Sequence, residues 1–283
     1  LHTHTSIPKQ PTMSDGPDKV LITGAQGFFG AHIIKKLLAI GAVPHIFDLA
    51  ENQAILKQIL TETELASIGC TYGDIADAKL VSDMVLKLEP TSIIHLAGLQ
   101  IPTCKARPVL GATVNVIGTI NVFEAAKSLA EKTGKPAPRI VYASSAAVLG
   151  PASDYKTVPV PDDEYHKPRT LYGVFKIANE GTARIYYQDH KINSIGLRPL
   201  TCFGVGREVG MTSSPTKAIK AILLGRESYE IPFSGVTGFS YVEDVAKIFV
   251  GCTKSPRAGA ECFNVRGDVI TVSDFVTQRG LRL

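Results

Sequence analysis

The chain has 283 residues, of which 45% are hydrophobic and 20% charged, and its formal net charge is +4 at pH 7. This length and apolar content suit one large α/β domain, with or without a small appendage. The small net charge argues against binding to nucleic acid or a membrane surface, and no apolar run approaches the length of a transmembrane helix.

The five cysteines are scattered and form no Cys-x-x-Cys pair. They favour free thiols in a reducing compartment, here the cytoplasm, over a disulfide framework or a metal site. Residues 1–18 are polar and contain prolines, so they are expected to be a disordered tail. Because Met13 looks like an ordinary start, residues 1–12 are expected to be upstream or vector-derived sequence.

The first predicted strand, at residues 20–22, leads into Gly24, Gly27 and Gly30, and an apolar periodic helix follows. In a dinucleotide-binding turn, Gly24 allows the tight turn, Gly27 allows close approach to a pyrophosphate, and Gly30 allows the helix to pack on the strand. The free N–H groups at the helix start would face the phosphates. The alternative is a glycine-rich turn that binds no nucleotide.

Asp48 ends the second predicted strand, residues 43–48, and lies 18 residues after Gly30. An acid at this point can accept hydrogen bonds from the ribose hydroxyls of an adenosine, and it would repel a 2′-phosphate. The cofactor predicted from these residues is therefore NAD rather than NADP. The alternative for Asp48 is a capping acid.

Strand and helix patterns alternate to about residue 200, which predicts βαβ units and a doubly wound parallel sheet of the Rossmann type. Residues 19–199 are expected to form the NAD-binding domain. Residues 200–283 are expected to form a small, irregular α/β substrate-binding part over the carboxyl edge of the sheet. Local predictions include a helix over 51–60, helices over 109–132 and 170–190, and, in the second part, a helix over 214–224, a strand near 228–231, a helix over 241–254 and a strand near 261–265.

Tyr172 and Lys176 open a predicted helix and, four residues apart, share one of its faces. A phenol titrates near pH ~10, but a fixed ammonium beside it favours the phenolate, so the pair can act as a general base. Ser144 and Ser145 end a predicted strand, where a hydroxyl can hold the alcohol to be oxidised. The alternatives are a surface helix pair and ordinary capping of a turn.

The sequence resembles the extended short-chain dehydrogenase/reductase superfamily, in particular its NAD-dependent epimerase/dehydratase family. The resemblance lies in a dinucleotide turn, a serine at the end of a later strand, and a Tyr-x-x-x-Lys pair 27 residues after that serine. The resemblance covers about residues 19–275. The matching segments are residues 23–30, 74–75, 95–98, 115–119, 144–150, 172–176, 198–199 and 241–246.

The resemblance implies Ser145, Tyr172 and Lys176 as catalytic residues, with Tyr172 as the base or acid and Lys176 lowering its pKa. No metal is implied. The residues that it implies for NAD binding are Gly24, Gly27, Phe28, Phe29, Gly30, Asp48, Asp74, Ile75, Leu96, Ala97, Gly98, Asn115, Ser144, Tyr172, Lys176 and Pro199.

The sequence departs from nucleotide-sugar members of the family at two places. Thr237 stands where those members usually have an arginine, and residues 201–203 lack their asparagine. Both departures weaken the prediction of a nucleoside diphosphate. Arg207 lies in a glycine-rich loop similar to that of sugar-acid dehydrogenases, where it would meet a carboxylate or phosphate. Substrate contacts are therefore expected at Ser145, Arg207 and Thr237.

The favoured function is an NAD-dependent dehydrogenase that takes hydride from a hydroxyl-bearing carbon of a small sugar or sugar acid. The alternative is a nucleotide-sugar epimerase or dehydratase that keeps NAD bound, and a lesser alternative is an NAD-sensing regulator without turnover. By analogy with relatives, the helices over 109–132 and 170–190 are expected to form a homodimer. Family members usually continue through a final helix, so the C-terminal part is expected to be incomplete.

Overall fold

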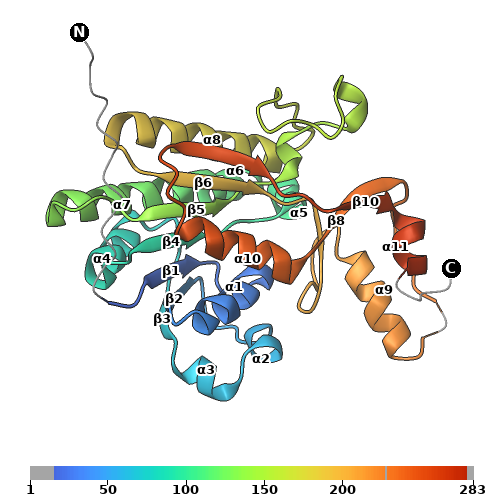
Figure 1. Cartoon of the computed structure of the whole chain (residues 1–283), viewed down its shortest axis with the longest axis horizontal. Helices are drawn as coiled ribbons and strands as arrows, with labels where there is room; N and C mark the ends of the chain where they lie inside the picture. Colours follow the sequence, from blue (N-terminus) through green and yellow to red (C-terminus); the bar gives the residue numbers. More distant parts are fainter. Residues whose placement is uncertain (1–15, 227, 279–283) are drawn as a thin grey trace, which may run out of the picture.

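The computed structural model describes residues 16–226 and 228–278, and its centre is a seven-stranded sheet in the order β3-β2-β1-β4-β5-β6-β9 (Figure 1). All neighbouring strands in it run parallel. The order reverses between β1 and β4, which confirms the predicted doubly wound Rossmann fold. Its strands are β1 (Lys19–Thr23), β2 (Val43–Asp48), β3 (Gly69–Tyr72), β4 (Ser92–His95), β5 (Arg139–Ala143), β6 (Ser194–Arg198) and β9 (Ala260–Asn264).

Helices cover both faces of this sheet and enclose a hydrophobic cluster on each side (Figure 1). Helices α1 (Phe28–Ala39) and α10 (Val242–Thr253) pack on one face, and α4 (Ala78–Leu88), α7 (Gly118–Thr133) and α8 (Leu171–His190) on the other. Along β1, Val20 and Ile22 join the first cluster while Leu21 joins the second, because strand side chains alternate between faces. Each such fully buried side chain contributes about 1.5–3 kcal/mol.

One long helix, Pro108–Thr133, is continuous through α6 (Pro108–Ala112), a π-helical turn η1 (Thr113–Ile117) and α7. With 26 residues and a mean hydropathy of 1.4 over its most apolar window, it is long and apolar enough to cross a bilayer, contrary to the prediction that no segment is. Half of that window is buried, and α7 packs against α4 and α8. These features are typical of the core helix of a folded domain.

The C-terminal part contributes to both sheets. Its β9 completes the large sheet and its α10 packs on that sheet, while β7 (Thr201–Phe203), β8 (Val236–Tyr241) and β10 (Asp268–Thr271) form a second sheet in the order β10-β8-β7. Stacked Phe239 and Phe275, with ring centroids 4.2 Å apart, anchor a third cluster beside it. The helices of this part, besides α10, are α9 (Ser214–Leu223) and α11 (Val272–Gln278).

Two local predictions are wrong. The helix expected over residues 51–60 is reduced to α2 (Leu56–Ile59), because Thr61 starts the separate α3 (Glu62–Ala66) through a capping box with Glu64. Residues 228–231 form no strand. The strands nearby form instead at β7, β8 and β10, where neighbouring backbone completes the hydrogen bonds. Residues 1–15 of the expected tail lie outside the described residues.

Candidate active site

The glycine turn between β1 and α1 has the geometry that the sequence predicts. Gly24 has a positive φ of 65°, and a Cβ atom on it would lie 2.7 Å from the Ala97 nitrogen at the exit of β4. A Cβ on Gly30 would lie 2.1 Å from the Ala25 carbonyl oxygen, so only glycine lets α1 approach the turn so closely. Gly27 is the N-cap residue, and Phe28 and Phe29 begin α1.

Asp48 lies at the carboxyl end of β2, beside this turn. Its carboxylate accepts hydrogen bonds from the backbone N–H groups of Gln26 and Leu49, each at 2.9 Å. Asp74 and Ile75 follow β3, the neighbouring strand; Asp74 is exposed, while Ile75 is buried. These residues therefore gather at the carboxyl edge of the sheet on the β1 side, as predicted.

A buried network fixes the exit of β4, which carries Leu96, Ala97 and Gly98. Thr23 Oγ1 accepts from the Ala97 N–H and lies 2.7 Å from His95 Nδ1, while His95 Nε2 lies 3.0 Å from the Thr119 hydroxyl. Burial and the nearby ammonium of Lys176 lower the pKa of His95 to about 3, so its ring is neutral and bridges the two hydroxyls.

Asn115 lies in the π-helical turn and is fully buried. Its side-chain amide accepts from the Leu99 N–H at 3.1 Å and donates to the Leu99 and Gly111 carbonyls. A Cβ on Gly98 would lie 2.6 Å from Asn115 Oδ1 and 3.7 Å from Lys176 Nζ. Asn115 thus supports the site from behind and brings the β4 exit next to the catalytic helix.

Ser145 and Tyr172 come together as predicted. Ser145 Oγ accepts from the Ala147 N–H at 3.1 Å at the start of η2 (Ala146–Val148), so the capping role is also present. Burial is the largest influence on the pKa of Tyr172 and raises it; the hydrogen bond with Ser145 and the charge of Arg207 act in the opposite direction. Tyr172 begins α8, whose first turn is capped by the Thr170 hydroxyl.

Lys176 is buried one turn further along α8, and its Nζ donates to the Ala143 carbonyl at 2.6 Å. Burial lowers its pKa to about 8. The expectation that it lowers the pKa of Tyr172 stays a prediction: the net shift of the Tyr172 pKa is upward, because burial dominates. The ammonium lies 5.5 Å from the centroid of the Tyr172 ring and is held by a strand carbonyl.

Arg207 reaches the site from the loop after β7. Its guanidinium lies 5.4 Å from the centroid of the Phe28 ring, and its Nη2 donates to the Thr212 hydroxyl at 3.1 Å. Its Nε is buried and has no hydrogen-bond partner among the residues that the structure describes. Burial lowers the pKa of Arg207, whereas neighbouring Cys202 and Tyr172 raise it. Arg207 therefore lies between the glycine turn and Tyr172.

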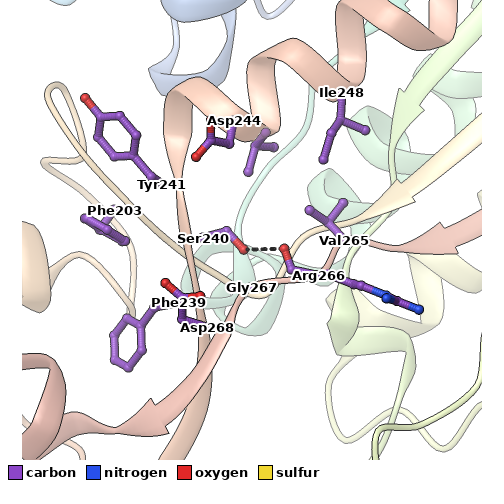
Figure 2. A pocket seen from close by; sticks show the side chains of 11 residues that line it. Phe203, Phe239, Ser240, Tyr241, Asp244, Ile248, Val265, Arg266, Gly267 and Asp268 are labelled. Atoms are coloured by element: carbon purple, nitrogen blue, oxygen red, sulfur yellow. Dashed lines mark hydrogen bonds between the residues drawn. The ribbon is translucent and has the colours of Figure 1, made fainter.

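Two further predicted residues occupy supporting positions. Thr237 lies in the small sheet, where its hydroxyl is 3.2 Å from that of Thr201. Pro199 is buried after β6, and its carbonyl accepts from the Ala146 N–H. A separate cavity of about 430 Å³ lies between α10 and the small sheet, and none of the predicted site residues lines it. Figure 2 shows its lining, where Ser240 Oγ donates to the Arg266 carbonyl at 3.3 Å.

Sequence reasoning missed two residues near Ser145, Tyr172 and Lys176. Cys104, in α5 (Ile101–Ala106), is fully buried, and its Sγ lies 3.3 Å from Asn115 Nδ2. Glu180 lies two turns beyond Tyr172 and accepts from the Ser144 hydroxyl at 2.5 Å. Its helical spacing of eight from Tyr172 was a signal that could have identified it, whereas no sequence signal places Cys104 there.

Residues 20–265 match the family model described as "NAD dependent epimerase/dehydratase family". The chain is 26% identical over 258 residues to the UDP-glucose 4-epimerase of Mycolicibacterium smegmatis, covering 89% of this chain and 78% of that protein. It is 30% identical over 252 residues to UDP-glucuronate 4-epimerase 5 of Arabidopsis thaliana, covering 84% of this chain and 54% of that protein. The chain thus spans about half the length of this second relative.

Two solved structures share the fold. The UDP-N-acetylglucosamine 4-epimerase from Methanobrevibacter ruminantium M1, in complex with UDP-N-acetylmuramic acid, superposes with a TM-score of 0.78 at 22% identity, covering 92% of this chain and 80% of that one. The UDP-glucose 4-epimerase from Brucella ovis, in complex with NAD, superposes with a TM-score of 0.74 at 20% identity, covering 92% and 81%.

Proposed function

Because the chain belongs to the NAD-dependent epimerase/dehydratase family, we propose that it is a nucleotide-sugar 4-epimerase whose substrate carries a carboxylate. The chain is an NAD-dependent enzyme of the extended short-chain dehydrogenase/reductase type. This proposal replaces the free sugar-acid dehydrogenase as the favoured function, since the named relatives are nucleotide-sugar epimerases.

The residues present fit the cofactor. The close approach of Gly24 to Ala97, and of Gly30 to Ala25, leaves bare backbone at the start of α1, where phosphates bind. Asp48 offers a carboxylate to ribose hydroxyls at the end of β2. When bound, NAD supplies the acceptor and donor of hydride.

The protein's own contribution is proton transfer and positioning. Ser145 would hold the reacting hydroxyl, and Tyr172 would take its proton and later return it. A phenol with a raised pKa needs help to ionise near neutral pH, and each pKa unit corresponds to about 1.4 kcal/mol. Lys176 and Arg207 would supply positive charge near the phenol.

The observation that carries the substrate class is Arg207. Its guanidinium has a buried, unpartnered Nε and lies near both Phe28 and Tyr172. A buried N–H group without a partner is costly unless a ligand supplies an acceptor. A guanidinium binds a carboxylate with two parallel hydrogen bonds, so a uronate or another acidic sugar suits this position.

The test compares UDP-glucuronate with UDP-glucose as substrates for the wild-type enzyme and for Arg207→Ala. We expect the substitution to lower kcat/KM for UDP-glucuronate about 10–100-fold, the equivalent of one charge-assisted pair, and to change that for UDP-glucose much less. The exposed Arg226→Ala is the matched control. Equal losses for both substrates would contradict a carboxylate site at Arg207.

A dehydrogenase acting on a free sugar acid remains the second candidate, because Thr237 pairs with Thr201 where nucleotide-sugar members have an arginine. The two functions differ in the fate of the hydride. A dehydrogenase releases NADH, seen as growing absorbance at the NADH band with free sugar acids. An epimerase interconverts the nucleotide sugar with no net NADH.

The proposal includes a homodimer in the cytoplasm. All five cysteines are free, which suits a reducing compartment. Helices α6 and α8 contact each other, and both have exposed apolar side chains. These are Val109 on α6 and Val174 and Ile185 on α8. These would form the contact between the two copies.

A further inference from the structure

Helix α8, which carries Tyr172 and Lys176, has a buried carboxylate in line with these two residues. Tyr172, Lys176 and Glu180 follow one another at intervals of four, so they lie on one face over successive turns. Glu180 is only 3% exposed. A buried carboxylate is costly unless it is paired and hydrogen-bonded, so its partners show what it holds in place.

Glu180 is fully paired, and its partners belong to two neighbouring strands. Arg198, at the end of β6, donates from Nε to Glu180 Oε1 at 2.8 Å and from Nη2 to Oε2 at 2.7 Å. Ser144, which follows β5, donates to Oε1 at 2.5 Å. Arg198 is itself 3% exposed and Ser144 2%. One carboxylate thus joins α8 to the ends of β5 and β6. Ser145 lies just after the first of these strands, and Pro199 lies just after the second.

The other side of Arg198 holds the loop between η2 and α8, which includes η3 (Ala152–Asp154) and extends from the body of the molecule (Figure 1). Arg198 Nη1 donates to the Asp162 carbonyl at 2.8 Å. Nη2 lies 2.9 Å from His166 Nε2, which must accept because a guanidinium only donates. Asn264 adds bonds to the Asp162 carboxylate and the Val160 carbonyl.

We propose that Glu180 and Arg198 form a buried positioning unit for the active site. Through Ser144 the unit fixes the backbone that carries Ser145, and through Arg198 it anchors the 150–169 loop at the carboxyl edge of the sheet. Neither residue touches the reacting atoms, so both are positioning residues. The assignment rests on the proposed function only in taking Ser145, Tyr172 and Lys176 as the catalytic group.

The charge of Glu180 also reaches Lys176. The titratable groups that face Lys176 are Cys104, His95, Tyr172 and Glu180. Burial raises the pKa values of Cys104 and Tyr172 and lowers that of His95, so these three are neutral near pH 7. Glu180 is the anion of the four, and it favours the ammonium form of Lys176.

The first arm of the test measures loop anchoring by hydrogen exchange of residues 150–169, which needs no substrate. Glu180→Gln keeps the shape and removes the charge, and His166→Phe removes the acceptor for Arg198. We expect both to speed exchange in the loop at least about tenfold, and His166→Gln to restore part of the protection. Asp189→Asn, exposed on the same helix, is the matched control.

The second arm measures turnover and its pH profile. We expect Glu180→Gln to lower kcat about tenfold or more with little change in NAD affinity, and to move the alkaline limb to lower pH. A loss of packing alone would not move that limb.

Unchanged loop protection in His166→Phe and in folded Glu180→Gln would overturn the proposal, as would an unmoved alkaline limb in Glu180→Gln. Hydrogen exchange is measured without substrate, so it tests the positioning unit independently of the proposed function. Wild-type protein that turns over no sugar would refute the proposed function, and the exchange measurement would still decide on the positioning unit.

Discussion

In the proposed function, Tyr172 carries the proton transfer while its neighbours carry the binding. If its phenol oxygen exchanges the proton, Tyr172→Phe should lower kcat by about 10²–10⁴-fold. The ring itself remains, so the dissociation constant of NAD, measured by titration calorimetry, should stay within about threefold. Tyr187→Phe on the same helix is the control. Retained turnover in Tyr172→Phe would remove the base assignment.

We expect Lys176 to make NAD binding depend on pH. With a pKa lowered to about 8, the free enzyme has an ammonium below that pH and a neutral amine above it. If the ammonium donates to the ribose, as the family resemblance implies, binding takes up a proton above pH ~8, and affinity falls by up to about tenfold per pH unit there. Titrations between pH ~6.5 and ~9.5 measure this, and Lys176→Met should give a flat profile. A flat profile in the wild type would contradict the assignment.

The predicted site residues that the structure brings together are those tied to strand ends and helix starts. Ser145 and Tyr172 meet because a strand end and a helix start meet at the carboxyl edge of a parallel sheet. Their pKa values were not predictable in the same way. Burial is the largest influence on the pKa of Tyr172, and the charges that act on it belong to Cys104 and Arg207, which come from distant elements.

At the scale of elements, the turn between β1 and α1 depends on close backbone contact. Gly30→Ala would place a Cβ 2.1 Å from the Ala25 carbonyl oxygen, where neither backbone can yield easily. We expect a loss of about 2–3 kcal/mol in the free energy of unfolding, measured with urea. Gly251→Ala in α10 meets no atom within 4 Å and should stabilise by about 0.5–1 kcal/mol. Equal effects at the two positions would contradict the packing argument.

The elements of the large sheet were predictable because hydrophobic periodicity and turn signals agree along residues 19–198. The small sheet was not predictable in this way. Its strands β7, β8 and β10 are short, contain Thr and Gly, and are stabilised by partners up to 38 residues away rather than by their own pattern. The same dependence on partners explains why the segment at 228–231 remains without regular structure.

At the scale of the molecule, α8 presents an apolar stripe to solvent. Leu171, Val174 and Ile185 are 44%, 46% and 54% exposed and fall on one face of the helix. Gly181 lies on that face with no atom within 4 Å of where its Cβ would be, so a second helix could approach closely. Exposed apolar area of this kind commonly marks an interface.

We therefore expect the wild-type protein to sediment as a dimer at micromolar concentration and Ile185→Glu to sediment as a monomer, because a charge buried between two copies of α8 would lack a partner. Val269→Glu, on β10 in the small sheet and 66% exposed, is the matched control and should remain dimeric. Since Tyr172 lies in the first turn of α8, dissociation should also lower turnover while leaving the fold, followed by circular dichroism, intact. A monomeric wild type, or an Ile185→Glu dimer, would show that this face of α8 serves another purpose.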